Sequence, residues 1–201
     1  MVKKGRGVFI CLEGIDGSGK TTVAHHLVGA LARNGYNAVY TAEPSKGAIG
    51  RIVKKSILQG GRRLPRVLEA VLFAVDRVDH IEREVTPLLN EGKIVVCDRY
   101  LYSSISYQGA DGAMLEWVKG INKHAIKPDL AIYIDVPPEV VIDRIKRKKS
   151  IMETLPIQKR VREVYLNLVS EKQLMMVDGN ASKHKVAKNV EDLVFSFLRK
   201  H

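Results

Sequence analysis

Cysteine and long apolar runs are scarce in this 201-residue chain. Its two cysteines, Cys11 and Cys97, each lie inside an apolar run and form no CxxC pair, so we expect buried, reduced side chains. No apolar run approaches the about 20 residues that cross a bilayer. The start, Met1–Gly5, leads directly into a strand-like segment rather than a signal peptide. These absences argue against export or a membrane partner and favour a cytoplasmic protein.

Acidic residues are also in deficit. The chain has 33 Lys+Arg against 22 Asp+Glu, which leaves a formal net charge of +11. Such a surplus suits anionic partners, either nucleotides or nucleic acid, and does not choose between them. With 45% hydrophobic residues, the length fits one globular domain with a proper core, so a single domain is expected over residues 1–201.

Short apolar runs alternate with longer helical patterns along the chain, which is typical of an α/β protein. The runs are apolar along most of their length, as in a parallel sheet that helices cover on both faces. The predicted strands are Val8–Glu13, Ala38–Thr41, Ile94–Cys97, Leu130–Val136 and Leu174–Val177. The predicted helices are residues 20–34, 48–59, 66–90, 111–125, 138–149, 156–172 and 183–199.

A glycine-rich loop between the first predicted strand and the first predicted helix is the most specific motif. Its residues are Gly14, Ile15, Asp16, Gly17, Ser18, Gly19, Lys20 and Thr21, followed by Thr22. This is a P-loop in the context that the motif requires, so these residues are expected to bind ATP. The glycines allow successive N–H groups to face phosphate oxygens, and the helix N-terminus favours the negative charge. Lys20 is expected to bridge the β- and γ-phosphates, and the Thr21 hydroxyl to ligate Mg²⁺.

Asp98 ends the apolar run Ile94–Cys97 and therefore emerges at the carboxyl edge of the predicted sheet, where α/β folds bind their ligands. A carboxylate there reaches Mg²⁺ or its waters; the alternative is an Asp that caps a loop or a helix start. The adjacent Arg99 favours a metal–phosphate site with catalytic Asp98 and Arg99. The six histidines form no HExxH motif and no zinc spacing with cysteine, so the implied metal is the Mg²⁺ of the nucleotide.

Beyond the P-loop, the chain resembles the thymidylate kinases among the nucleoside monophosphate kinases along essentially its whole length. The segments that carry the resemblance are the P-loop with its preceding Glu13, the Glu43-Pro44 pair, Leu72–Arg77, Asp98–Gly109, and Pro138-Glu139-Val140 before a basic segment. The resemblance implies a three-layer α/β/α P-loop kinase fold with a five-stranded parallel sheet and a short basic lid at about residues 144–155. It also implies Mg·ATP as the donor, dTMP as the acceptor and a homodimer.

By the same resemblance, five residues bind the acceptor nucleoside. Phe73 would stack on the thymine ring, and Arg77 would hydrogen-bond its carbonyl edge. Ser104 and Gln108 would contact the N3 side of the base. Tyr107 would stand near C2′ and favour deoxyribose.

The resemblance places further residues around the acceptor phosphate. Arg99 would hold the monophosphate, Asp16 would orient the acceptor, and Glu43 would line the acceptor or metal site. The arginine expected in the next helix could be Arg51, but Lys54 is an equal alternative. This region also departs from the family pattern, since Ser45-Lys46 stands where many members have Gly-Gly.

An apolar stripe gives an independent reason to single out Phe73. The stripe comprises Val67, Val71, Ala74, Val78, Ile81 and Val85. Phe73 falls roughly 120° from its centre and shares a face with Arg77, four positions further on. If the stripe faces the core, Phe73 and Arg77 are free to hold one ligand. The alternative is that Phe73 packs under a neighbouring helix.

The catalytic cation is expected to come from the lid. Some thymidylate kinases carry a basic residue inside the P-loop, where this chain has Gly17. The lid offers Arg144 and Arg147 among several lysines, and a planar guanidinium binds phosphate in a bidentate way. The alternative is a basic run at a solvated helix end.

Other functions remain as alternatives. A different or broader acceptor, such as UMP, CMP or dUMP, is possible within the kinases. Asn122-Lys123-His124-Ala125 is similar to the guanine-reading Asn-Lys-x-Asp of GTPases, but Ala125 replaces the decisive Asp. A nucleic-acid-stimulated ATPase rests only on the +11 charge, so nucleic acid is not an expected partner.

Overall fold

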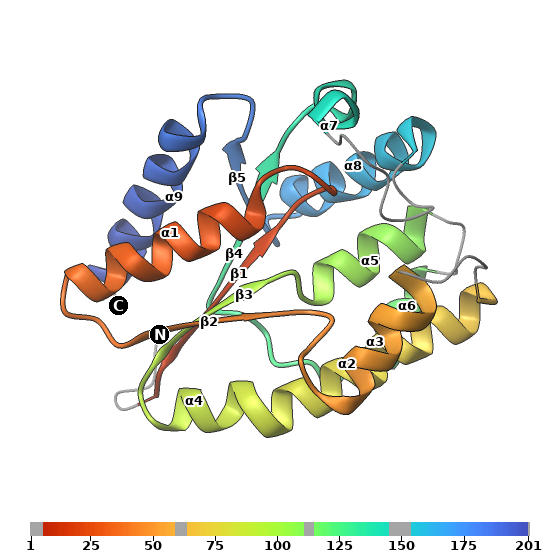
Figure 1. The fold of residues 1–201 in the computed structure, drawn as a ribbon, viewed down its shortest axis with the longest axis horizontal. Helices are drawn as coiled ribbons and strands as arrows, with labels where there is room; N and C mark the ends of the chain where they lie inside the picture. Colours follow the sequence, from red (N-terminus) through yellow and green to blue (C-terminus); the bar gives the residue numbers. More distant parts are fainter. Residues whose placement is uncertain (1–5, 59–63, 111–114, 145–153, 201) are drawn as a thin grey trace.

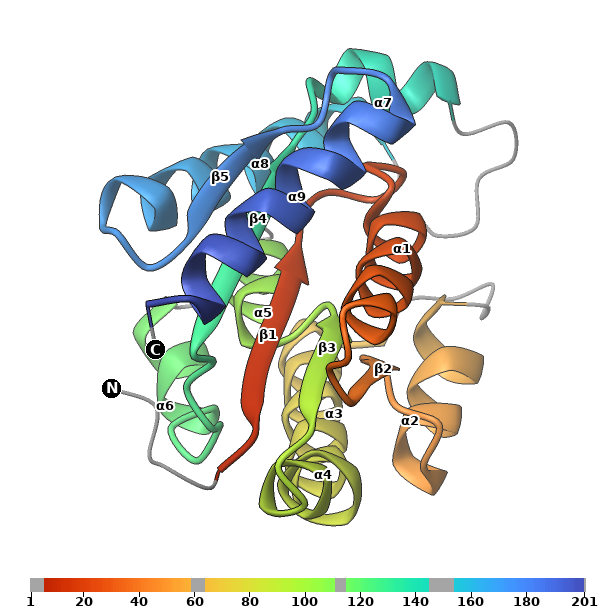
Figure 2. The same ribbon diagram turned by 90° about the vertical axis from the view of Figure 1, so that its left-hand side faces the viewer.

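The computed structural model describes residues 6–58, 64–110, 115–144 and 154–200. Five parallel strands form one sheet in the order β2-β3-β1-β4-β5. Their bounds are β1 (Val8–Glu13), β2 (Ala38–Ala42), β3 (Ile94–Asp98), β4 (Leu130–Asp135) and β5 (Met175–Asp178). All five predicted strands are confirmed, with ends that differ by one residue at most. β1 lies at the centre of the sheet, between β3 and β4 (Figure 2).

Helices cover both faces of this sheet (Figure 1). Helices α1 (Lys20–Arg33) and α9 (Lys183–Leu198) pack against each other on one face. On the other face, α4 (Thr86–Asn90) contacts β3 and α8 (Leu155–Ser170) contacts β4. The remaining helices are α2 (Ala48–Val53), the π-helix η1 (Lys54–Leu58), α3 (Arg66–His80), the π-helix η2 (Ile81–Val85), α5 (Leu101–Ala110), α6 (Leu115–Ile121) and α7 (Pro138–Arg144). The three-layer α/β/α fold is confirmed; the proposed lid lies almost wholly outside the described residues.

Helix α5 was not predicted from the sequence. The pattern placed the next helix at residues 111–125, whereas the structure has α5 at Leu101–Ala110 and the shorter α6 at Leu115–Ile121. The α5 sequence is rich in serine and tyrosine, which have modest helix propensity. Its buried side carries Ser104, Ser106 and Gln108 beside Tyr102 and Ile105, so it mixes polar and apolar side chains. Tertiary packing against α8 overrides the weak local signal.

We expected the apolar stripe on the third predicted helix to face the core, but along α3 it is largely exposed. Val67 and Val78 are 62% and 47% exposed, whereas Ala74 and the C-terminal members Ile81 and Val85 are buried. The buried side of α3 carries polar residues instead, among them Arg77 and His80. Hydrophobic periodicity identifies an apolar face but not the element that it contacts. Here the opposite face contacts polar groups of neighbouring elements, such as Thr41 of β2 and Ser104 of α5.

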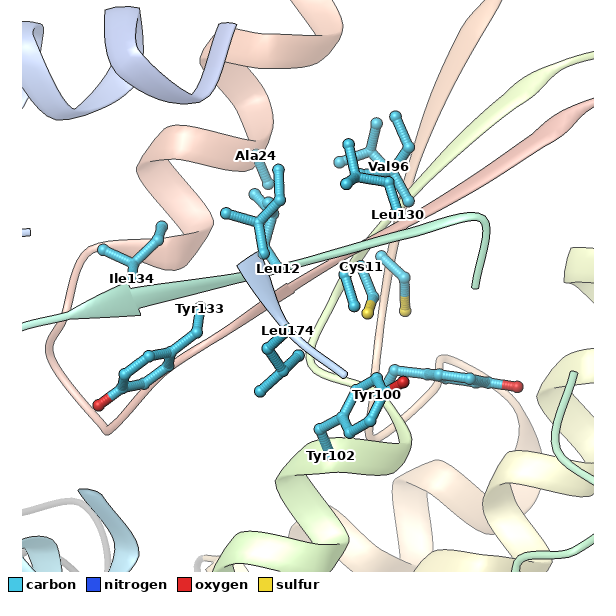
Figure 3. Packing of buried hydrophobic residues seen from close by; sticks show 14 of the residues in the cluster. Cys11, Leu12, Ala24, Val96, Tyr100, Tyr102, Leu130, Tyr133, Ile134 and Leu174 are labelled. Atoms are coloured by element: carbon cyan, nitrogen blue, oxygen red, sulfur yellow. The ribbon is translucent and has the colours of Figure 1, made fainter. Parts of the chain in front are cut away.

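The central strands form the densest part of the core. Every residue of β3 is buried, and so are five of the six residues of β1. Figure 3 shows Cys11 on the side of the strands that carries Tyr100 and Tyr102, opposite Leu12 and Ala24. Cys11 and Cys97 are free and buried, as predicted. Within the described residues, no helix is long and apolar enough to span a membrane.

Candidate nucleotide-binding site

The P-loop connects the end of β1 to the start of α1. Gly17 and Gly19 have φ angles of 75° and 93°, in the left-handed region that glycine adopts without a Cβ penalty. Gly19 is the N-cap of α1 and provides no side-chain cap, so the N–H groups of the first turn can bind an anion. The loop therefore has the backbone geometry that the predicted phosphate cradle requires.

Lys20 lies over this loop rather than in solvent. Its Nζ donates to the Ile15 carbonyl at 2.7 Å and to Ser18 Oγ at 3.3 Å. Only 5% of Lys20 is exposed. Burial, followed by repulsion from Arg99, lowers the pKa of Lys20 to about 8. The ammonium is thus held over the loop by two oxygens of the loop itself.

Thr21 and Asp98 meet beside the P-loop, 77 positions apart in the sequence. The Thr21 hydroxyl donates to Asp98 Oδ2 at 2.5 Å. Asp98 Oδ1 is buried without a hydrogen-bond partner in the described part of the chain. An unsatisfied carboxylate oxygen beside a hydroxyl is a donor set that fits Mg²⁺, which takes a few protein oxygens and completes its shell with phosphates and water. Among the described residues, no group of three or more His, Cys, Asp or Glu forms a separate metal site.

Arg99, Asp16 and Tyr107 form one hydrogen-bonded cluster next to the P-loop. Arg99 Nη2 contacts Asp16 Oδ1 at 2.5 Å, and the Tyr107 hydroxyl donates to Asp16 Oδ2 at 2.8 Å. The Arg99 guanidinium lies over the Tyr107 ring, 5.2 Å from its centroid. Burial alone would raise the pKa of Asp16, but Arg99 and then Lys20 hold it below its usual value. Three residues predicted for the acceptor side are therefore adjacent in space.

Glu13 was not assigned a role from the sequence. It is fully buried at the end of β1. Its carboxylate accepts from the Tyr100 N–H at 2.9 Å, from Ser103 Oγ at 2.6 Å and from the Tyr165 hydroxyl at 2.9 Å. Burial raises the pKa of Glu13, against the opposing effect of these hydrogen bonds. Glu13 thus ties the start of α5 and the middle of α8 to the P-loop strand.

Arg77 is the centre of a second buried cluster, on the side of α3 that faces α5. It is 2% exposed, and its Nη2 donates to Glu43 Oε2 at 2.7 Å and to Ser104 Oγ at 3.0 Å. Gln108 is buried on the same helix as Ser104, whereas Phe73, one turn before Arg77, is half-buried. The four residues predicted to read the base therefore come from two helices that contact each other.

Two further residues complete this cluster, and the sequence analysis missed both roles. His80 Nδ1 contacts Glu43 Oε1 at 3.2 Å, while its Nε2 contacts Thr41 Oγ1 at 2.7 Å. Asn122 Oδ1 accepts from Arg77 Nη1. The available signal for His80 was its position three residues after Arg77, on the same helical face. No signal pointed to Asn122, because its contact depends on how α6 packs against α3.

Some predicted residues are not brought into these clusters. Arg51 is exposed and donates to the Lys46 carbonyl at 2.9 Å, and Lys54 Nζ donates to the Ser45 carbonyl at 3.2 Å. Neither contact decides which of the two binds a phosphate. Arg144 is the last residue of α7, but its side chain, like all of Arg147, lies outside the described residues.

The P-loop and the two clusters lie at the carboxyl edge of a parallel sheet, around the ends of β1, β2 and β3. A P-loop with charged side chains at this edge of the sheet defines a P-loop nucleotide-binding protein. The thymidylate kinase family model matches residues 12–190. The chain belongs to the thymidylate kinase family.

Similar proteins from several archaea carry the same family name. A probable thymidylate kinase of Staphylothermus marinus is 42% identical, with 98% of this chain and 99% of that protein aligned. Probable thymidylate kinases of Pyrococcus abyssi and Pyrobaculum aerophilum are 41% and 43% identical. Their alignments cover 94% and 95% of this chain, and 96% and 98% of those proteins. The similarity therefore extends over nearly the full length of this chain and of each of these relatives.

Proposed function

We propose that this chain transfers the γ-phosphoryl group of Mg·ATP to dTMP, which gives dTDP for dTTP synthesis. Membership in the thymidylate kinase family supports the reaction and its cofactors. The observation that carries the acceptor assignment is a pair of unsatisfied buried atoms in the described residues: Arg77 Nε, a donor, and Gln108 Oε1, an acceptor.

This pair matches the edge of thymine. Thymine offers the O4 carbonyl, an acceptor for the Arg77 Nε donor, and N3–H, a donor for the Gln108 Oε1 acceptor. Cytosine offers the opposite pattern at these positions, an amino donor and an N3 acceptor. A buried polar atom is unfavourable without a partner, so a ligand that satisfies both atoms is preferred. The pattern supports thymine or uracil over cytosine, and Tyr107 beside the predicted ribose supports the deoxy form.

The other residues divide the phosphate chemistry among them. Lys20 would hold the β- and γ-phosphates, and Arg99, oriented by Asp16, would hold the acceptor phosphate. Thr21 and Asp98 would hold Mg²⁺, which supplies positive charge to the transferring phosphoryl group. We further propose that Arg144 or Arg147 supplies the remaining charge from a lid over a single domain, as no basic residue occupies the Gly17 position.

The buried position of Asn122 weakens the GTPase alternative. A guanine-reading asparagine must present its amide to the base, but Asn122 is 6% exposed and is engaged with Arg77. Its predecessor in sequence is the last residue of α6, not of a strand. The similarity to Asn-Lys-x-Asp is therefore one of sequence and not of structure.

An acceptor panel tests the proposal. With Mg·ATP, the purified protein should phosphorylate dTMP far faster than UMP, CMP, dCMP or AMP, and dUMP should rank next. Equal rates across the panel would overturn the assignment. ATP consumption that depends on added DNA rather than on a nucleotide acceptor would instead favour the nucleic-acid-stimulated ATPase.

We also propose that the chain forms a homodimer in the cytoplasm. Two exposed valines of α3, Val75 and Val78, line a groove of about 650 Å³ together with Ile49, Val71 and Ala74. Such apolar surface on a helix is typical of an interface. The two buried thiols support a reducing compartment.

A further inference from the structure

The side chain of Asn122 is fixed at both ends of its amide. Its Nδ2 donates to the Val118 carbonyl at 2.8 Å, and its Oδ1 accepts from Arg77 Nη1. Only the nitrogen can donate to a carbonyl, so the first bond determines which way the amide faces. The oxygen is therefore directed at the arginine. Since Asn122 is 6% exposed, water does not compete strongly for either bond.

The guanidinium of Arg77 is held by contacts at both of its ends, not only by the carboxylate of Glu43. Its Nη2 donates to Glu43 Oε2, Ser104 Oγ and the Tyr100 carbonyl at 2.7, 3.0 and 3.1 Å. The Tyr100 ring lies 5.3 Å from the guanidinium carbon. These contacts hold one end of the guanidinium, and the contact from Asn122 holds Nη1. With both ends engaged, rotation of the group is blocked, and Nε is the nitrogen without a partner among the described residues.

We propose that Asn122 is a positioning residue for acceptor recognition. It holds the guanidinium of Arg77 in the orientation in which its unsatisfied donor meets the O4 carbonyl of the base. The inference rests on the proposed function, because it takes Arg77 as the residue that contacts the base. Preorganisation of this kind acts on binding, so its loss raises the KM for dTMP and leaves kcat nearly unchanged.

Two reciprocal substitutions separate positioning from a structural role. Asn122→Ser keeps a short donor that can reach the Val118 carbonyl, as serine does in helices, but it cannot reach Arg77. Asn122→Asp keeps an oxygen for Arg77 and loses the donor to Val118. We expect Asn122→Ser to raise the KM for dTMP by about 10-fold, whereas Asn122→Asp stays within about 3-fold of the parent. A larger KM for dTMP in Asn122→Asp than in Asn122→Ser would show that Asn122 acts only by capping the end of α6, and would overturn the inference.

Asn34 provides a matched control for the loss of a helix-ending amide. It is the C-cap of α1, and its Nδ2 donates to the Ala30 carbonyl at 2.9 Å, the same spacing of four residues as in Asn122. It lies at the end of α1 remote from the P-loop. Asn34→Ser should leave the KM for dTMP and the preference for dTMP over dCMP unchanged. Asn122→Ser should narrow that preference, which a purely structural defect would not do.

Arg77→Ala separates failure of the inference from failure of the proposed function. If Arg77→Ala leaves the KM for dTMP unchanged, Arg77 does not contact the base, and both proposals fail at that residue. If Arg77→Ala raises KM but Asn122→Ser behaves like Asn34→Ser, only the positioning role is overturned. In the Arg77→Ala background, Asn122→Ser should add no further increase, because the two residues act through one contact. Additive effects would contradict the inference.

Discussion

Arg99 adopts a backbone conformation that few residues other than glycine adopt. Its φ angle is 68°, which costs a non-glycine residue on the order of 1 kcal/mol. Several hydrogen bonds offset this cost, including those from the Tyr100 N–H to Glu13 and from Arg99 Nη1 to the Gly14 carbonyl at 3.3 Å. The turn brings the guanidinium back over the P-loop to Asp16. Arg99, which we propose holds the acceptor phosphate, is thus fixed in place by contacts within the chain.

Phe73 is the residue with the simplest expected effect on binding. Phe73→Ala should raise the KM for dTMP about 5- to 150-fold, because stacking on a base is worth about 1–3 kcal/mol. Steady-state kinetics with dTMP as the varied substrate measures this. Phe195→Ala, which removes an aromatic ring packed 6.0 Å from Tyr36, is the control and should leave KM unchanged. An unaltered KM in Phe73→Ala would refute the stacking role.

Arg51 and Lys54 are competing candidates for a contact with the acceptor phosphate. Lys54 is half-buried, and Arg51 is exposed. A charge that is partly shielded from water interacts more strongly with a phosphate. We therefore expect Lys54→Ala to raise the KM for dTMP more than Arg51→Ala does. A larger effect of Arg51→Ala in the same assay would assign the contact to Arg51.

Among the elements, helix α8 contacts both Glu13 at the end of β1 and Asp16 in the P-loop. It supplies Tyr165 to Glu13 and Gln158 to Asp16, with Gln158 Nε2 at 3.3 Å from Asp16 Oδ2. At the end of β4, Arg162 of α8 binds Asp135 through two hydrogen bonds, both of 2.8 Å. The position of α8 therefore affects the P-loop strand and the acceptor cluster together.

The Asp135–Arg162 pair makes stability depend on pH. Burial alone would raise the pKa of Asp135, but hydrogen bonds from Arg162 and Tyr133 outweigh it and lower the pKa in the folded state. The stabilisation is therefore present above the unfolded pKa of about 4 and is lost as the pH falls through the folded value. Asp135→Asn should lower the free energy of unfolding by about 1–2 kcal/mol at pH 7, since Arg162 is partly exposed.

Urea unfolding at pH 7 and at pH 3 checks this expectation. The difference between Asp135→Asn and the parent should shrink at the lower pH. Asp192→Asn, which removes an exposed ion pair with Lys188, should change stability by less than about 0.5 kcal/mol at either pH. A constant difference for Asp135→Asn at both pH values would show that its charge is not the cause.

For the molecule as a whole, the apolar face of α3 has no covering element within the described residues, as Val75 and Val78 are 45% and 47% exposed. Val75→Glu should convert a dimer into a monomer with little change in protomer folding, because a charge in a closed apolar interface is strongly unfavourable. Light scattering coupled to size-exclusion chromatography measures the mass. Met176→Glu adds the same charge at another exposed apolar position and should leave the mass unchanged. A monomeric parent protein would contradict the proposal.

Short-range sequence patterns were sufficient to predict most of the fold and the P-loop side of the candidate site. The P-loop is a contiguous motif with its own backbone geometry, and continuous apolar runs identified all five strands. The pairing of Thr21 with Asp98 followed from one rule, that parallel strands end at the same edge of a sheet. Recognition of the family then indicated which polar residues of α3 and α5 belong together.

The sequence therefore determined the cofactor, the strands and the chemistry at the sheet edge, since each depends on neighbouring residues or on strand direction. Packing alone decided that α5 is a helix, that the apolar side of α3 faces outward, and that Glu13, His80 and Asn122 lie in the buried polar clusters. These features depend on contacts between residues 37 to 152 positions apart, such as His80 with Glu43 and Tyr165 with Glu13. No local periodicity records such contacts.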